Sequence, residues 1–434
     1  MDNYELKKQI PVTSKYDVIV AGGGPSGICA AVAAAREGAR VALIERYGIL
    51  GGNLTSGHVG PILGMVGKGT MRDELMGLLG VPENDALGYT GLAHDVEKAK
   101  NVITDFVAAE KIDVLLQTFV ADVIKDGNDL EGLVLSGKEG LYAICSDVII
   151  DATGDGDVAF FSGAPYETGR KQDGLMQPVT HEFTIRGIDE SKGIACVGDI
   201  DDVRLNGERF LDFTRRCAET GILPENLAAV RLHRTTLPGE RRVNTSQVNG
   251  VNAVKTAQLF PAETELRKQE SLLVDFLHKY LPGYENCSLA DSADTLGVRE
   301  TRRIMGEYLL KSEDVISGRT FKDVMVHKTE FLIDIHNPAG AGQAEAEIQN
   351  SKPYDIPYRC FVPLETENLF IVGRCISGTH KAHASYRVMS ICMAMGQAIG
   401  IAAALCVRKG CTPRALQPEE VQKVLTAHGV ELFN

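Results

Sequence analysis

The sequence predicts an α/β fold in which a parallel sheet carries a β-meander, with a second α+β domain inserted into the chain. Three observations predict it: a glycine-rich turn between a strand and a helix within residues 16–45, three closely spaced strands over 113–150, and a short strand ending at Gly373. These strands run into small residues, as expected where the carboxyl edge of a parallel sheet meets a ligand.

The first element is a buried strand followed by a tight turn. Tyr16–Ala21 is mostly apolar and β-branched, and it leads into G-G-G-P-S-G at 22–27, a G-x-G-x-x-G pattern. A helix is expected over 28–37 and a second strand over 40–44, closed by Glu45, which lies 45 − 22 = 23 positions after Gly22. In this arrangement the glycines and the helix N-terminus bind a pyrophosphate, and the acidic residue binds a ribose.

A second glycine-rich segment, GGNLTSG at 51–57, follows within a dozen residues of Glu45. A nicotinamide-binding domain would normally continue here to another helix and strand. A flavin protein needs a loop along its longer cofactor, so this segment favours FAD over NAD.

The next predicted strands are Asp113–Lys125, Leu130–Ser136 and Leu141–Ile150, joined by short turns. A meander at this place differs from the βαβ continuation of a nicotinamide domain. The last strand runs into Asp151-Ala-Thr-Gly154, a turn suited to the cofactor edge of the sheet.

A third strand of this kind, 368–372, is followed by a predicted long helix over Ala384–Val407. We therefore expect a Rossmann-like domain built from residues 1–165 and 355–434. Residues 166–354 would form an inserted substrate or cap domain, whose charged runs suggest helices over Leu205–Glu219, Ala262–Leu281 and Val298–Leu310.

Composition excludes several classes of protein. The chain of 434 residues carries 45 basic and 58 acidic side chains, a formal net charge of −13, which argues against nucleic-acid binding. No charged and then apolar leader begins the chain, and the apolar stretch 391–407 is short for a membrane span, so a cytoplasmic protein with no membrane partner is expected.

The ten cysteines are scattered singly with no C-x-x-C pair, so reduced and mostly buried thiols are expected. No histidine spacing suggests a metal site, and we expect none.

Six segments carry a resemblance to a known family. They are VIVAGGGPSGICAA, LIERYGILGGNLTSG, DVIIDATGDGDVA, LGVRETRRIMGEY, YDIPYRCFVP and NLFIVGRCISGTHKAHASYRVMSICMAMGQAIGIAAAL. Together they resemble the bacterial FAD-dependent oxidoreductases of the glutathione-reductase-type flavoprotein fold, a poorly characterised group. The resemblance spans nearly the whole chain, and it implies FAD as the cofactor but no particular substrate.

The resemblance also implies residue roles. The pyrophosphate would be held by Gly22, Gly24, Pro25, Ser26 and Gly27, and the adenosine ribose by Glu45 with Arg46 beside it. The remaining cofactor contacts would come from Gly51, Gly52, Asn53, Thr55, Ser56, Gly57, Val120, Ala152, Thr153, Gly154, Asp155, Gly373 and Arg374.

A helix beginning near Ser385 would aim its N-terminus at the pyrimidine edge of the flavin. Reduction places negative charge there, and a helix N-terminus stabilises a partly buried anion by up to about 2 kcal/mol. Such a helix would favour hydride acceptance at N5.

Candidate catalytic residues lie near the same place. His383 and Arg387 are four positions apart, so on one helix they share a face and could bind an anionic or hydroxylated substrate and take its proton. His336, on a predicted loop of the inserted domain, could close over the flavin. Arg299, Arg302 and Arg303 are expected on a helix, as a solvated face or as an anion site.

The sequence therefore predicts an FAD-dependent oxidoreductase that transfers a hydride between flavin N5 and a small polar metabolite. The alternatives are a fumarate- or enoyl-type reductase acting on a carboxylate, a non-redox protein stabilised by FAD, and a plain NAD(P)-binding oxidoreductase. The electron donor or acceptor, covalent attachment of FAD (His58 being one candidate) and the oligomeric state, a homo-oligomer included, stay open.

Overall fold

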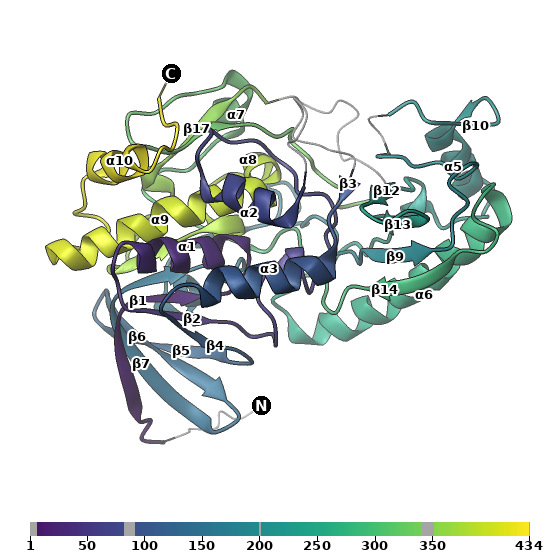
Figure 1. Ribbon diagram of the computed structural model, residues 1–434. Coiled ribbons are helices and arrows are strands. Elements are labelled where there is room, and N and C mark those ends of the chain that lie inside the picture. Colours follow the sequence, from purple (N-terminus) through teal and green to yellow (C-terminus); the bar gives the residue numbers. More distant parts are fainter. Residues whose placement is uncertain (1–6, 82–91, 199–200, 341–350, 434) are drawn as a thin grey trace.

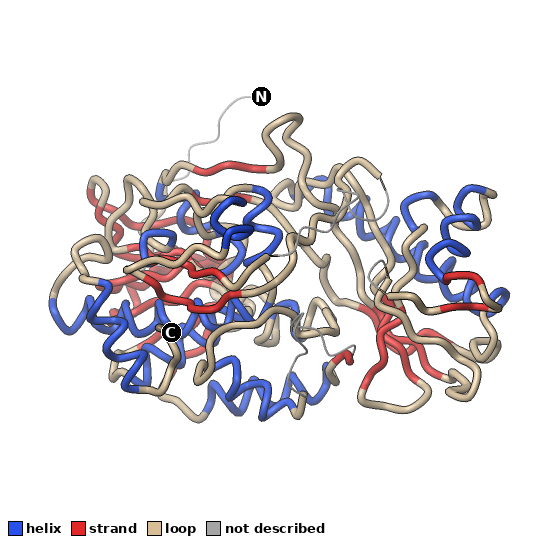
Figure 2. The backbone as a smooth tube through the Cα atoms, turned by 90° about the horizontal axis from the view of Figure 1, so that it is seen from above, coloured by secondary structure: helices blue, strands red, loops and turns tan. Residues whose placement is uncertain are grey.

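The computed structural model describes residues 7–81, 92–198, 201–340 and 351–433. A seven-stranded sheet with its helices forms the larger part of the molecule, and a second sheet with two helices lies beside it (Figures 1 and 2). The strands of the larger sheet are β1 (Val12–Ala21), β2 (Val41–Ile44), β4 (Ile112–Leu115), β5 (Phe119–Asp126), β6 (Asp129–Gly137), β7 (Gly140–Asp151) and β18 (Leu369–Ile371). This mixed α/β architecture confirms the predicted fold class.

Strand β7 belongs to two parts of this sheet. Its first half pairs antiparallel with β6, which pairs with β5, and this is the predicted meander. Strand β1 pairs parallel with β7 from Ala143 to Asp151 and continues to β2 and β4, while β18 pairs parallel with Ile149–Asp151 alone. Strand β18, from near the C-terminus of the chain, thus joins the sheet beside the last residues of β7.

Helices α1 (Pro25–Arg36) and α9 (Met389–Lys409) cross the same side of the sheet and touch each other (Figure 1). Their backbones approach closely because α9 carries glycines at the contact. An added Cβ would lie 2.1 Å from the Ser26 carbonyl oxygen at Gly396 and 2.2 Å from that of Ala30 at Gly400. The apolar sequence of α9 therefore reflects burial.

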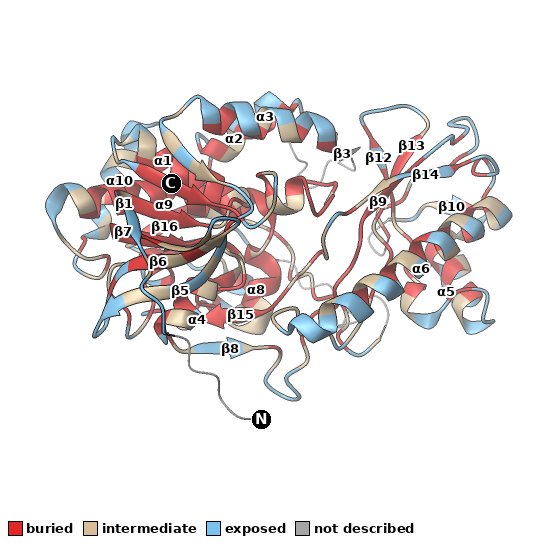
Figure 3. Cartoon of the chain, turned by 90° about the horizontal axis from the view of Figure 1, so that it is seen from below, coloured by how far each residue is buried: buried red, intermediate tan, exposed pale blue. Residues whose placement is uncertain are grey.

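By length and composition α9 could cross a membrane, but 94% of its most apolar window is buried inside the protein. Figure 3 shows it among the buried elements. This is the burial expected of the core helix that the sequence predicted for 391–407.

The second sheet has the strand order β14-β9-β13-β12-β3. Its strands and helices are β3 (Leu92–Ala93), β9 (Phe183–Arg186), β12 (Leu232–Thr235), β13 (Glu240–Val243), β14 (Ser288–Ser292), α5 (Phe210–Glu219) and α6 (Thr256–Tyr280). Its apolar core is separate from the core of the larger sheet and draws on residues 183–287.

The remaining described elements surround these two sheets. They are η1 (Gly52–Leu54), α2 (Met71–Leu79), α3 (Val96–Ala108), α4 (Asp157–Ser162), β8 (Tyr166–Thr168), β10 (Arg204–Leu205), β11 (Glu208–Arg209), η2 (Glu225–Leu227), β15 (Arg302–Ile304), α7 (Ser312–Ser317), β16 (Val324–Thr329), β17 (Tyr354–Pro357), η3 (Tyr358–Cys360), η4 (Gly373–Cys375), α8 (His380–Tyr386) and α10 (Pro418–Ala427). The division at 166 and 354 stays a prediction. Ile304 and Ile335 pack into the core of the larger sheet, which favours a second unit ending nearer residue 301.

Four local predictions are wrong. The helix expected over Leu205–Glu219 begins only at Phe210, because Asn206 and Gly207 turn the chain at positive φ between the paired strands β10 and β11. Segment 298–310 contains strand β15 rather than a helix, because Arg302 and Arg303 are held by residues distant in sequence. Segment 113–125 divides into β4 and β5, with Gln117 at a positive φ of 51° between them. The expected helix over 384–407 is broken at Val388, so α8 and α9 are separate helices.

We predict that a glycine-to-alanine substitution changes the free energy of unfolding in opposite directions in helices α9 and α2. Gly400→Ala should lower the free energy of unfolding by more than about 1 kcal/mol, because the new methyl group would meet the Ala30 carbonyl. Gly77→Ala, at an exposed α2 position with open space around the added carbon, should raise it by up to about 1 kcal/mol. Urea unfolding measures both, and equal effects would contradict the close α1–α9 contact.

Candidate functional site

The glycine turn after β1 is closed by backbone contacts at two positions. Gly22 has a φ of 104°, and an added Cβ there would lie 2.4 Å from the Ala152 carbonyl oxygen. An added Cβ on Gly27 would lie 1.8 Å from the Gly22 carbonyl oxygen. These glycines are required by the fold itself, since the ends of β1 and β7 and the start of α1 meet here.

Gly24 differs from both of these glycines. It precedes α1 in extended conformation, with φ −75°, and an added Cβ would meet nothing within 4 Å. The open space lies at the N-terminus of a helix of 12 residues that begins with Pro25, where free N–H groups and the helix dipole favour an anion. This gap fits a pyrophosphate.

Glu45 is held in place by backbone donors. Its two carboxylate oxygens accept N–H groups from Gly23 at 2.7 Å and from Tyr47 at 2.8 Å. The side chain is buried but lines the cavity at the end of β2. It can still accept a ribose hydroxyl, because each carboxylate oxygen has a further lone pair.

The turn after β7 is organised by two buried carboxylates. Asp151 accepts bonds from the Thr153 hydroxyl at 2.7 Å and the Ala159 N–H at 2.9 Å, and burial raises its pKa to about 6. Asp155 is also buried, but the positive charges of Arg374 and Arg46 outweigh burial and lower its pKa. Its carboxylate lies 3.1 Å from the Arg374 guanidinium, which it directs along the turn.

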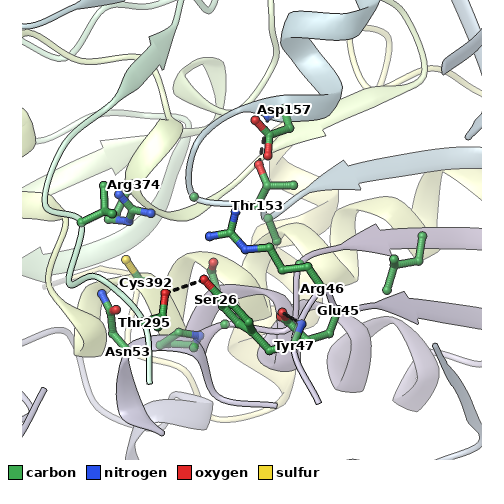
Figure 4. A pocket seen from close by; sticks show the side chains of 18 of the residues that line it. Ser26, Glu45, Arg46, Tyr47, Asn53, Thr153, Asp157, Thr295, Arg374 and Cys392 are labelled. Carbon is green, nitrogen blue, oxygen red and sulfur yellow. Dashed lines mark hydrogen bonds between the residues drawn. The ribbon is translucent and has the colours of Figure 1, made fainter. Parts of the chain in front are cut away.

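These elements line a first cavity with about 1090 Å³ of empty space, part of which is open to solvent. Figure 4 shows its labelled side chains converging from β2, the β7 turn and the C-terminal segments. Of the cofactor residues that the sequence predicted, the cavity is lined by Gly22, Gly24, Pro25, Ser26, Glu45, Arg46, Gly52, Asn53, Val120, Ala152, Thr153, Gly154 and Arg374. Gly27, Gly51, Thr55, Ser56, Gly57, Asp155, Gly373 and Ser385 are not among its lining residues.

Several lining residues were missed by sequence reasoning. Tyr47 and Thr295 meet across the cavity with 2.7 Å between their hydroxyl oxygens, although they are far apart in the chain (Figure 4). Phe119, Leu296 and Met389 also line it. Only Tyr47 and Phe119 had a sequence signal, because each adjoins a predicted cofactor residue or segment.

A second cavity of about 630 Å³ adjoins the first. The two share Asn53, Val298, Arg374, Arg387 and Met389. The other lining residues of the second cavity are Val59, Pro61, Leu63, Thr180, Glu182, Asn244, Gly297, Arg299, Asp334, His336 and Val388. It combines charged groups with a small apolar wall.

Two predicted catalytic residues meet in this second cavity. The Arg387 guanidinium lies 3.0 Å from the Asp334 carboxylate, and His336 Nε2 lies 3.4 Å from the same carboxylate. Burial, followed by the charge of Arg299, lowers the pKa of His336 to about 3, so its imidazole is neutral. With Nε2–H directed at Asp334, it can accept a hydrogen bond from a ligand through Nδ1 but does not carry a charge at neutral pH.

Glu182 is a second-cavity residue that the sequence analysis did not identify. Its side chain is buried and accepts the Gly60 N–H at 2.9 Å. Burial raises its pKa to about 7, although the Gly60 N–H and the charges of Arg242 and Arg299 oppose the rise. A carboxyl group that titrates near neutral pH inside a cavity can exchange a proton with a ligand.

His383 is not brought to either cavity, which corrects its predicted place at the flavin. It lies inside the short helix α8, buried against Tyr386 with 5.5 Å between ring centroids. Burial lowers its pKa well below 6.5, so the ring is neutral. Ser385 is likewise internal to α8, donating to the Phe331 carbonyl at 2.6 Å, so it does not begin the helix that faces the cavity. That helix is α9, and its Met389 lines both cavities.

Comparison with known proteins identifies a family and a cofactor. The sequence model of the family described as FAD dependent oxidoreductase matches residues 17–425. Soluble pyridine nucleotide transhydrogenase of Mycobacterium tuberculosis is 24% identical over 276 residues, 58% of this chain and 56% of that protein. Thiamine thiazole synthase of Methanococcus aeolicus is 30% identical over 169 residues, 37% of this chain and 59% of the relative. The chain thus matches little more than half the length of these relatives.

Among solved structures, p-nitrophenol 4-monooxygenase PnpA from Pseudomonas putida has a TM-score of 0.51 to this chain at 11% sequence identity. The alignment covers 96% of this chain and 89% of that structure. At this identity the likeness concerns the fold alone.

We predict that Gly24→Val leaves the fold intact and removes the flavin. The extended backbone and open space at Gly24 accept a β-branched side chain, whereas that side chain would fill the space for the pyrophosphate. The measurement is flavin absorbance per protein together with circular dichroism.

Gly77→Val is the matched control, since its added carbon also meets open space but lies in α2, away from both cavities. This variant should keep its flavin. Full flavin content in Gly24→Val would contradict the assignment of the pyrophosphate site.

Proposed function

The chain belongs to the FAD dependent oxidoreductase family, and we propose that it transfers a hydride between FAD and a small polar metabolite. FAD would occupy the first cavity, with its pyrophosphate at Gly24 and its adenosine ribose at Glu45. The metabolite would occupy the second cavity.

The observation that carries this proposal is the continuity of the two cavities. Asn53, Arg374, Arg387 and Met389 line both of them, so they would hold the flavin end of the cofactor on one side and the metabolite on the other. When bound, FAD supplies the two-electron chemistry at N5 of its ring. The protein must then position the metabolite and exchange one proton with it.

We assign the proton exchange to Glu182 in place of His383. Glu182 lines the second cavity, whereas His383 lines neither. The carboxylate form of Glu182 would accept a hydroxyl proton when a metabolite is oxidised. The protonated carboxyl form would return that proton in the reverse direction. The bond from the Gly60 N–H fixes one of its oxygens, which orients the group during the exchange.

Arg387 and His336 would position the metabolite. Asp334 holds both side chains, at 3.0 Å and 3.4 Å. With its Nε2–H directed at the Asp334 carboxylate, the neutral His336 has Nδ1 left as an acceptor, which can take a hydrogen bond from a hydroxyl group. This proposal retains two of the three residues that the sequence predicted as catalytic.

The cellular compartment and the electron partner of the protein are proposals as well. All ten cysteines are free and eight are buried, which supports a reducing compartment such as the cytoplasm. The transhydrogenase relatives are named for pyridine nucleotide, but the chain matches only 56% of their length. Pyridine nucleotide is therefore one electron partner to test beside a quinone and oxygen.

The function is tested with the purified flavoprotein under anaerobic conditions. A panel of small hydroxylated, carbonyl and amino metabolites is added, and loss of the flavin absorbance is recorded. At least one compound should reduce the flavin, and an oxidised pyridine nucleotide, a quinone or oxygen should restore the absorbance. Two results together would contradict the proposal. No metabolite reduces the flavin, and after a reduced donor has reduced it, no oxidised metabolite reoxidises it.

We predict that Glu182→Gln removes an ionisation near pH 7 from the rate of flavin reduction. In the wild type, kcat/KM for oxidation should fall tenfold per pH unit below about 7, because the carboxylate form that accepts the proton is lost. The Gln variant should be slower by about 10²- to 10⁴-fold, with a flat profile. Chemical reduction of its flavin by dithionite should be unchanged, as a control for cofactor binding.

Stability supplies a readout independent of turnover. The pKa of Glu182 is raised from 4.5 to about 7, so its contribution to folding is present below pH 4.5 and is lost as pH rises to about 7. The melting temperature of Glu182→Gln relative to wild type should therefore rise between these pH values. A difference that does not change with pH would contradict the buried, titrating carboxyl group.

A further inference from the structure

The second cavity contains a guanidinium that has no carboxylate partner among the described residues. Arg299 precedes β15 and donates from Nη1 to the Pro178 carbonyl at 2.8 Å. Within the described part of the chain, no carboxylate oxygen lies within 4.0 Å of its nitrogens. This differs from Arg374 and Arg387, which have Asp155 and Asp334 as partners.

The surroundings of Arg299 disfavour its charged form. Burial and then the charge of Arg387 lower the pKa of Arg299 to about 9, although Asp334 and Glu182 act in the opposite direction. Even so, the group is charged at neutral pH. An anion entering the cavity would lower both costs. It would pair with the buried guanidinium, and its charge would offset the repulsion from the neighbouring arginine.

The two other arginines of the second cavity are also incompletely hydrogen-bonded. Arg387 Nε and Arg374 Nη1 are buried atoms with no hydrogen-bond partner among the described residues. Both side chains line the second cavity, but they also line the first and would therefore face the cofactor. Arg299 lines only the second cavity, so the metabolite is the ligand that it can reach.

The walls limit the kind of anion. A planar guanidinium matches a carboxylate through two parallel hydrogen bonds. Glu182 and Asp334 face the same cavity, and they would repel a second negative charge on the ligand. Pro61, Leu63 and Val388 supply an apolar wall for a carbon skeleton.

From these observations we propose that the second cavity selects a small monocarboxylate, whose carboxylate pairs with Arg299 and whose carbon skeleton lies against Pro61, Leu63 and Val388. This rests on the proposed function, of which it names the substrate class. Arg299 would bind the substrate through a charge that does not change during the reaction. Its loss should therefore weaken binding more than it slows the bound complex.

The test measures ligand binding to the FAD-loaded protein. Acetate, propionate and benzoate are each compared with the corresponding amide, with succinate and with inorganic phosphate. Binding is followed by the perturbation of the flavin absorbance and by the shift in melting temperature. The monocarboxylates should bind at least about tenfold more tightly than their amides, than succinate and than phosphate.

Variants connect this preference to one side chain. Arg299→Gln should weaken monocarboxylate binding by at least about tenfold, keep its full FAD content and leave amide binding unchanged, whereas Arg299→Lys should retain part of the preference. Arg242→Gln is the matched control, because Arg242 is a buried arginine near Glu182 that lines neither cavity. It should weaken binding less than Arg299→Gln does.

Four results would overturn the proposal: amides that bind as tightly as acids, tighter binding of phosphate or succinate, an Arg299→Gln variant that binds normally, or one that loses FAD. A panel in which only uncharged metabolites reduce the flavin would also overturn it, yet would leave the oxidoreductase function standing. Failure of the function itself would appear differently, as a flavin that no metabolite reduces while carboxylates still bind through Arg299.

Discussion

The meeting of three backbone segments at the carboxyl edge of the larger sheet is the constraint on which the site depends. β1 ends at Gly22, β7 ends before Ala152, and α1 begins directly over both, with no room for a side chain at Gly22 or Gly27. Because the segments touch through bare backbone, the free N–H groups of α1 face the cavity directly. The family match to FAD dependent oxidoreductases agrees with this arrangement.

The cofactor side of the site could be predicted because its signals are local. The strand, the glycine turn, the helix and Glu45 all lie within residues 16–45, so spacing alone places them. The same reasoning predicted that β7 and β18 belong to one sheet with β1, since all three end in small residues, and β7 does pair with both β1 and β18. The residues of GGNLTSG were only partly placed, because Thr55 turns away to donate to the Leu50 carbonyl.

The errors arose where distant partners override a local pattern. Arg299, Arg302 and Arg303 have the spacing of a helix face, yet Arg302 pairs with Asp157 and Arg303 donates to the Gly378 carbonyl. Both partners come from other segments of the chain and hold this one extended. His383 and Arg387 were expected on one face of a long helix. They stay one turn apart, since the Arg387 N–H donates to the His383 carbonyl, but the helix is interrupted at Val388 and only Arg387 lines the two cavities. No local signal marks that break.

The chemistry of the second cavity depends on which charges are already paired, and no sequence pattern carries that information. Three arginines and two carboxyl groups line the second cavity. Asp155 pairs with Arg374, Asp334 pairs with Arg387, and Glu182 accepts a backbone N–H. Among these three arginines, Arg299 alone has no acidic partner among the described side chains. Arg374 and Arg387 line both cavities. With FAD in the first cavity and the metabolite in the second, as proposed, contacts to the cofactor would fix these two arginines, whereas Arg299 would contact only the metabolite. Under the proposed function, cofactor and metabolite would be recognised by overlapping but distinct sets of charges, and the difference between these sets would give the second cavity its selectivity.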